Sequence, residues 1–181
     1  DTPSLLYFQD DGQLTPGIYQ LPLTADGQRA SAPPRMVSRA LGNTLSFDRD
    51  CAVLFDAVGI SRRRYRLFDL FRQLRGTTSV RGFSADRERL TTGARAREPD
   101  VSPDGGSVVY VTHHAGTSTL RLAALDAHSR PVRSRRLVPS ARYEQAYTPR
   151  FSPDGKQVAY SVWTRGGYRD IRIVDVATGA V

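Results

Sequence analysis

The chain has 181 residues, enough for one domain or for part of a repeat array. Its content of 39% apolar and 24% charged residues is typical of a water-soluble globular protein, and no apolar run is long enough to span a bilayer. The single cysteine, Cys51, excludes an internal disulfide and a cysteine-rich metal site.

The net charge of +8 comes almost entirely from arginine, because Lys156 is the only lysine among 26 basic residues. The arginines are scattered along the chain, and no recognition helix or aromatic-basic motif accompanies them. This pattern favours a solvated surface, and we expect no nucleic-acid partner. The chain opens at Asp1 with no initiator methionine and no signal peptide, which indicates that a leader or a preceding segment has been removed.

Short segments with the apolar pattern of β-strands, either alternating or continuous, follow one another along the chain. Helical periodicity is not convincing anywhere. Those in the first part are residues 5–8, 18–23 and the edge-like piece 35–38. The next are 45–55, 65–70 and the Arg-rich edge piece 87–91. The last two groups are 101–111, 120–125 and 135–139, then 151–161 and 171–176.

The segments repeat at intervals of about fifty residues. VSPDGGSVVYV (101–111) and FSPDGKQVAYS (151–161) are near copies, and LSFDRDCAVLF (45–55) aligns with them without a gap. This alignment makes Asp48 equivalent to Asp104 and Asp154. Further along, it makes residues 65–70 equivalent to 120–125. In the decayed third copy Phe47 replaces proline and Arg49 replaces glycine, which predicts a turn of another shape.

The conserved spacing within each copy predicts a hairpin. Proline fixes φ for a type I turn, and glycine supplies the positive φ that closes it. The residues concerned are Ser102, Pro103, Asp104 and Gly105, and again Ser152, Pro153, Asp154 and Gly155. We expect strand, tight turn, strand at both places.

Four-stranded antiparallel units of this length in tandem predict an all-β protein of β-propeller blades. The four strands of a blade are called A to D in chain order. About four blades are expected, with the first and last incomplete: residues 1–42 (strands B–D), 43–92, 93–140 and 141–181 (strands A–C). The strand count predicts one piece of a larger propeller, completed by another chain or by the missing part of the same protein.

The Ser-Pro-Asp-Gly hairpins, the strand and turn YRDIRIVDVATG (168–179) and LTTG (90–93) resemble the TolB-type β-propeller repeat family. The resemblance implies a non-catalytic bacterial scaffold for protein–protein interaction that is periplasmic or secreted. Similar repeats occur in propellers attached to prolyl-oligopeptidase-like and other peptidases. The alternative is therefore a propeller domain of a larger secreted hydrolase, where it gates or orients substrate.

In up-and-down blades the B–C and D–A loops lie at one end of the propeller, and here they carry arginines and aromatic residues. The partner-binding candidates are Arg62, Arg63, Arg64, Arg95, Arg97, Arg142, Tyr143, Trp163, Arg165 and Tyr168. Arginine with tryptophan and tyrosine is the composition of interaction hot spots. We expect this face to bind a protein with acidic groups; the other interpretation is a solvated loop face without a ligand.

Catalytic and metal-binding patterns are missing from the sequence. There is no Gly-x-Ser-x-Gly nucleophile motif and no phosphate-binding loop. His113 and His114 are adjacent and would point to opposite sides of a strand. We therefore expect no metal site, no cofactor and no catalytic residue. Cys51 lies beside an apolar strand, and its neighbours predict burial. An insertion at 76–85 is a candidate for blade-specific contacts.

Overall fold

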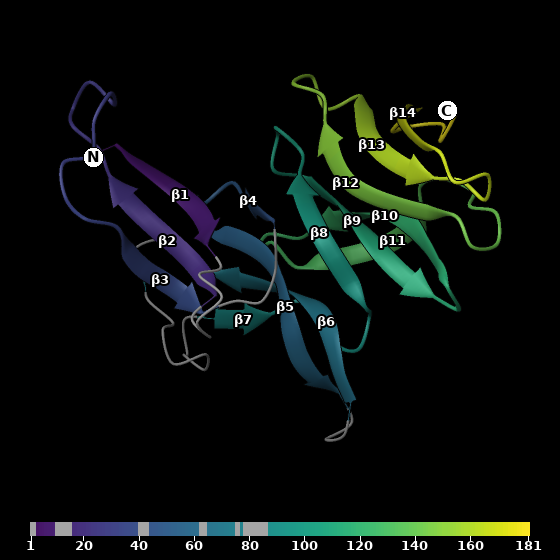
Figure 1. The fold of residues 1–181 in the computed structure, drawn as a ribbon, viewed down its shortest axis with the longest axis horizontal. Helices are drawn as coiled ribbons and strands as arrows, with labels where there is room; N and C mark the ends of the chain where they lie inside the picture. The colour runs from purple at the N-terminus through teal and green to yellow at the C-terminus, as the bar shows by residue number, and fades with distance from the viewer. Residues whose placement is uncertain (1–2, 10–15, 40–43, 62–64, 75–76, 78–86) are drawn as a thin grey trace.

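The computed structural model describes residues 3–9, 16–39, 44–61, 65–74, 77 and 87–181. Within these ranges the regular secondary structure is all β, arranged as four antiparallel sheets that follow one another across the molecule (Figure 1). In the same ranges no helix is long and apolar enough to cross a membrane. The prediction of an all-β fold is confirmed.

Each sheet contains its strands in chain order, as an up-and-down meander. The first sheet consists of β1 (Ser4–Gln9), β2 (Gly17–Pro22) and β3 (Arg35–Arg39). The second consists of β4 (Leu45–Phe47), β5 (Val53–Ser61), β6 (Tyr65–Gln73) and β7 (Arg87–Arg89). The third consists of β8 (Ala96–Val101), β9 (Ser107–His114), β10 (Thr117–Leu125) and β11 (Pro131–Arg136). The fourth consists of β12 (Gln145–Phe151), β13 (Gln157–Trp163) and β14 (Arg169–Asp175).

The sheets pack face to face, which explains the unbroken apolar run of β9 from Val108 to Val111. Val109 and Val111 face the fourth sheet, in a core cluster with Val158. Val108 and Tyr110 point the other way, toward the second sheet. Since successive side chains of a strand point to opposite faces, burial of both faces requires an unbroken apolar run. This is the packing expected of propeller blades.

The first sheet is joined to the second by an apolar cluster and by two side chains that reach its last strand. Gln73 Nε2 donates to the carbonyl of Val37 (2.9 Å), and Arg87 Nη1 donates to the carbonyl of Arg39 (2.8 Å). The Arg87 guanidinium lies 4.3 Å from the centre of the Phe71 ring. Burial lowers the pKa of Arg87 to about 10, so its charge is kept at neutral pH.

The two Ser-Pro-Asp-Gly segments form the same turn, as predicted. The Gly105 N–H donates to the Ser102 carbonyl (2.8 Å), and Ser102 Oγ accepts from the Ser107 N–H (2.9 Å). Asp104 Oδ1 accepts from Ser102 Oγ (2.5 Å) and from the Gly106 N–H (2.9 Å). The segment from Ser152 to Gln157 repeats these bonds. Each turn is therefore closed by its own side chains.

Matched glycine substitutions test this turn. Gly105 and Gly155 have φ values of +68° and +71°, a region that costs a residue with a Cβ about 1 kcal/mol or more. A Cβ at Gly105 would also lie 2.9 Å from Arg49 Cβ, whereas at Gly155 the nearest atom is 3.6 Å away. We expect Gly155→Ala to lower the free energy of unfolding by about 1 kcal/mol and Gly105→Ala by about 2 kcal/mol. Urea unfolding measures both, and equal losses would show that the Arg49 contact is unimportant.

The decayed third copy does have another turn, and the ungapped alignment through it is wrong. Asp48 Oδ1 accepts from the Ala52 N–H (2.9 Å), the bond that the hydroxyl of Ser102 makes in the third sheet. Strand pairing agrees, because Phe47 lies opposite Val53 as Val101 lies opposite Val108. Asp48 therefore corresponds to Ser102, and the turn is one residue shorter.

Three further expectations are corrected downstream. Leu70 pairs with Asp56 as Leu120 pairs with Val111, so Leu70 corresponds to Leu120. The sequence alignment of residues 65–70 with 120–125 is therefore wrong by five residues. The edge strand expected at 135–139 is β11, which ends at Arg136. Cys51 is exposed, because it closes the Asp48 turn at φ +57° before β5 begins. Residues 76 and 78–85 of the expected insertion lie outside the described part of the chain.

Candidate partner-binding surface

Three connections meet at one end of the third and fourth sheets: the β9–β10 turn, the β11–β12 loop and the β13–β14 turn. The Tyr143 N–H donates to Thr117 Oγ1 (2.9 Å), and Gln145 Nε2 donates to the Gly116 carbonyl (2.6 Å). Gln145 also lies directly opposite Trp163 in the fourth sheet. The two bonds hold the segment with Tyr143 against the β9–β10 turn, and the strand pairing places Trp163 beside this segment.

The side chains on this surface are aromatic and basic. Tyr143, Trp163 and Tyr168 have 51%, 43% and 75% of their surface exposed. The Arg142 guanidinium lies 4.7 Å from the Tyr143 ring centre, and that of Arg169 lies 5.5 Å from the Trp163 ring. We call Arg142, Tyr143, Trp163, Tyr168 and Arg169 the aromatic-arginine patch. Arg169 was not among the residues predicted from the sequence. Pairing of the two strands of the last hairpin, which places Arg169 opposite Trp163, was the signal that could have identified it.

The other predicted residues divide into three cases. Arg165 and Arg95 are exposed, the first in the β13–β14 turn and the second just before β8. Arg97 instead serves the packing of the second sheet on the third: its Nε lies 3.5 Å from Asp56 Oδ2, and its guanidinium stacks 4.3 Å over the Phe68 ring. Arg62, Arg63 and Arg64 lie outside the described residues.

The carboxyl group beside Arg97 is fully buried. Burial raises the pKa of Asp56 above its ordinary value, and the charge of Arg97 only partly offsets this. Thr44 Oγ1 lies 3.3 Å from the second oxygen, Oδ1. Arg97, whose side chain is 28% exposed, is therefore engaged in the contact between the two sheets.

The two neighbouring histidines have different surroundings. His113 is half-buried at the end of β9, whereas His114 is exposed. Burial, and next the charge of Arg97, lower the pKa of His113, so it is neutral at pH 7. Across the described ranges, no three His, Cys, Asp or Glu side chains are grouped in a way that could hold a metal ion.

A polar contact between the first strands of the third and fourth sheets was not predicted. Glu98 and Thr148, which precede prolines fifty residues apart, have φ values of +54° and +46° within β-bulges. The Thr148 N–H donates to Glu98 Oε2 (2.6 Å), which links the two sheets. The repeated proline at Pro99 and Pro149 was the available signal, because it marks a position where regular strand pairing is interrupted.

Sequence comparison relates the chain to known proteins over part of its length. TolB proteins of the Tol-Pal system from two strains of Xylella fastidiosa are each 31% identical to it over 128 residues, 67% of this chain. The chain spans only 28% of the length of these curated relatives. No protein-family model matches the sequence.

Solved structures with the same fold cover nearly the whole chain. TolB from Acinetobacter baumannii aligns with 97% of this chain and 39% of its own length, with a TM-score of 0.66 and 20% identity. A puromycin hydrolase aligns with 99% of this chain and 30% of its own length, with a TM-score of 0.60 and 20% identity. A prolyl endopeptidase aligns with 98% of this chain and 26% of its own length, with a TM-score of 0.56 and 11% identity.

The meandering sheets, their face-to-face packing and these likenesses define the protein class: an all-β protein built from β-propeller blades. Within that class, the Ser-Pro-Asp-Gly hairpins and the Xylella relatives place the chain in the TolB-type β-propeller repeat family. Membership establishes the fold, whereas function depends on the surfaces that the blades display.

Proposed function

We propose that this chain is a non-catalytic TolB-like scaffold that binds an acidic protein outside the cytoplasm, in the periplasm or after secretion. Residues 1–42, 43–92, 93–140 and 141–181 are its successive blades. The observation that carries the proposal is the aromatic-arginine patch, in which the β11–β12 loop and the β13–β14 hairpin display exposed aromatic rings beside guanidinium groups. The Xylella relatives, named as parts of the Tol-Pal system, support the location and the interaction role.

The chemistry of the patch favours a protein partner with carboxylate groups. Aromatic side chains bury a large area with little loss of conformational freedom, and arginine pairs with carboxylates in two-point contacts. The net charge of +8 attracts acidic proteins over long distances. Association should therefore slow as ionic strength rises.

Capture from a periplasmic extract of a bacterium that encodes the chain tests the proposal. We expect the unsubstituted chain to retain a specific acidic protein, and the double variant Tyr143→Ala/Trp163→Ala to bind it with a dissociation constant about 30-fold higher. Val132→Ala is the control, because Val132 is an exposed apolar residue on β11, away from the patch. If the double variant and the control bound the partner equally well, the patch would not be the binding surface and the proposal would be contradicted.

The outer faces of the end sheets support completion of the propeller by further blades. Ile171 (82% exposed) and Ile173 lie on the face of β14 that turns away from the third sheet. Leu5 is similarly exposed on β1, and Tyr7 stacks on Tyr19 beside it. Blades bury apolar side chains on both faces, so we propose that another chain, or further residues of the same protein, covers these surfaces.

The second candidate is a propeller domain of a larger secreted hydrolase. The likeness of nearly the whole chain to puromycin hydrolase and to a prolyl endopeptidase favours it. In this case the blades would gate or orient substrate for a catalytic domain. Determining the coding sequence on both sides of Asp1 and Val181 separates the candidates, since an adjoining α/β-hydrolase domain would establish the second.

A further inference from the structure

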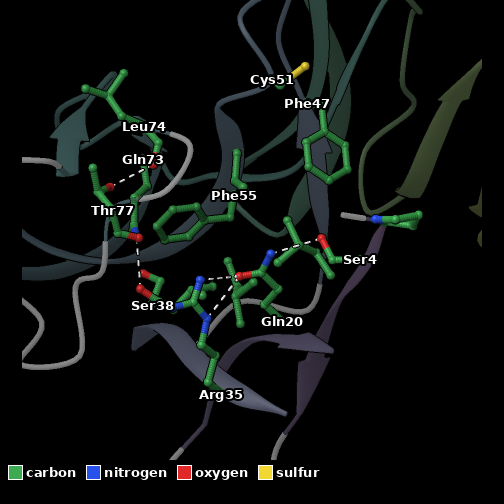
Figure 2. A pocket seen from close by; sticks show the side chains of 15 residues that line it. Ser4, Gln20, Arg35, Ser38, Phe47, Cys51, Phe55, Gln73, Leu74 and Thr77 are labelled. Carbon is green, nitrogen blue, oxygen red and sulfur yellow. Dashed lines mark hydrogen bonds between the residues drawn. The ribbon is translucent and has the colours of Figure 1, made fainter. Parts of the chain in front are cut away.

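A cavity of about 360 Å³, shown in Figure 2, lies between the first and second sheets. None of the residues that line it belongs to the aromatic-arginine patch. Its walls are mostly apolar and come from both sheets. They include Leu6, Ile18, Val37, Val53 and Phe55, with Phe47 and Leu74 exposed at its rim. Cavities of this size and lining accommodate small molecules.

Two buried oxygen atoms in the wall have no hydrogen-bond partner: Ser38 Oγ and Gln73 Oε1. Ser38 is 1% exposed and Gln73 is 3% exposed, so each oxygen carries the free-energy cost of a buried polar atom without a partner. The amide nitrogen of Gln73 is used by the carbonyls of Val37 and Thr77, both at 2.9 Å, which fixes the orientation of the side chain. Its oxygen therefore remains available to a ligand that donates a hydrogen bond.

A β-bulge accounts for the position of Ser38. Pairing shifts between Ile18 and Tyr19, so that Val37 is the extra residue of β3. Val37 and Ser38 are both buried in consequence, where a regular strand would turn one of them outward. Gly17 permits this arrangement, since a Cβ there would lie 2.6 Å from the Ser38 carbonyl oxygen.

The guanidinium of Arg35 stands at another point of the lining and is held in place. Its Nε and Nη2 donate to Gln20 Oε1 (3.2 and 2.8 Å), and Gln20 Nε2 donates to Ser4 Oγ (2.9 Å), as Figure 2 shows. A guanidinium has five N–H donors, so donors remain for a ligand. Arg35 is exposed, which makes it suited to a charged group at the entrance.

We propose that this cavity binds a small amphipathic carboxylate that also carries an N–H or O–H donor. The apolar body occupies the space lined by Leu6, Ile18 and Phe55, the donor reaches Gln73 Oε1 and Ser38 Oγ, and the carboxylate pairs with Arg35. Each group of the ligand matches a feature of the lining. The apolar body matches the apolar walls, the donor matches the buried acceptors without partners, and the carboxylate matches the guanidinium. The site is independent of the partner-binding function.

Three related probes test the ligand chemistry by isothermal titration calorimetry. N-acetyl-L-phenylalanine has an aromatic body, an amide N–H and a carboxylate. We expect it to bind saturably, and N-acetyl-L-phenylalaninamide and 3-phenylpropanoate each to bind about tenfold more weakly, because they lack the charge and the N–H donor respectively. Failure of N-acetyl-L-phenylalanine to bind at millimolar concentration, or equal affinities of all three probes, would overturn the proposal.

Two variants assign the contacts. Arg35→Gln should abolish the preference for the acid over the amide, and Ser38→Ala should weaken binding of N-acetyl-L-phenylalanine severalfold. Arg136→Gln, at an exposed arginine on β11, is the matched control and should change nothing. Thermal unfolding checks that each variant is folded, and unchanged binding by a folded Arg35→Gln variant contradicts the assignment.

Cys51 supplies a second readout, because this single cysteine lines the same cavity and is exposed. Saturating N-acetyl-L-phenylalanine should slow its alkylation by iodoacetamide in the unsubstituted chain. An unchanged alkylation rate at saturation would place the bound probe elsewhere and overturn the assigned site.

Discussion

Replacing Arg72 by methionine is expected to lower the free energy of unfolding by about 3 kcal/mol at pH 7. Arg72 Nε donates to Asp48 Oδ2 at 2.5 Å, and both side chains are buried beside the Asp48 turn. Methionine keeps much of the side-chain volume but leaves the Asp48 carboxylate without its cation. The penalty therefore arises from an uncompensated buried charge rather than from lost packing.

The effect should depend on pH. Burial alone raises the pKa of Asp48, but the hydrogen bond from Arg72 and the other bonds to the carboxylate reverse this, and the pKa lies below its ordinary value. The pair thus stabilises the fold at pH values above about 4, and this contribution is lost as the pH falls through the lowered pKa. Urea unfolding of both proteins at pH 7 and pH 3 should show a smaller difference at pH 3. Arg136→Met is the exposed control, and a difference as large at pH 3 as at pH 7 would contradict the mechanism.

Replacing Asp69 by alanine is expected to cost about 3–4 kcal/mol. This fully buried carboxylate pairs with Arg89, and its Oδ1 accepts from Thr91 Oγ1 (2.8 Å) and the Ala94 N–H (2.9 Å). Its Oδ2 also accepts from the Gly93 N–H (3.0 Å). One side chain on β6 therefore holds the segment that leads from the second sheet into the third, and alanine would leave several of these donors unpaired.

Hydrogen exchange gives this prediction a local measurement. The amides of Gly93 and Ala94 should lose protection in Asp69→Ala, because their acceptor is removed. Asp170→Ala is the matched control: Asp170 holds the corresponding position on β14 but is exposed. If the two variants lost similar stability, the bonds of Asp69 would not be what anchors the connection.

The blade fold was predictable because its signals are local. Pro103 and Gly105 define a turn by their own backbone preferences. The apolar run after the turn indicates a strand whose side chains are buried on both faces of the sheet. The chemistry of each hairpin is complete within six residues, so sequence spacing alone is sufficient to identify it. The all-β fold of propeller blades followed from two near copies of this unit.

The register of the second sheet could not be predicted in the same way. Asp48 is the same residue type as the aspartate of the other turns, yet its carboxylate takes the place of the serine hydroxyl. The hydrogen bonds and the strand pairing in the structure reveal this. The candidate surface was likewise only partly predictable. Arg97 and Arg142 were both expected in loops, but Arg97 lies in β8 beside Asp56, which is distant in sequence, whereas Arg142 lies in the β11–β12 loop and is exposed.

The paired bulges at Glu98 and Thr148 separate the contact between two sheets from the hairpins that follow them. Each lies on the first strand of its sheet, before the hairpin, and its backbone departs from regular strand pairing. A new side chain at either position would leave the turn bonds of Ser102 and Ser152 untouched. Replacing the Glu98 carboxylate would therefore release the Thr148 N–H and loosen the third sheet from the fourth, while both hairpins keep their turn bonds.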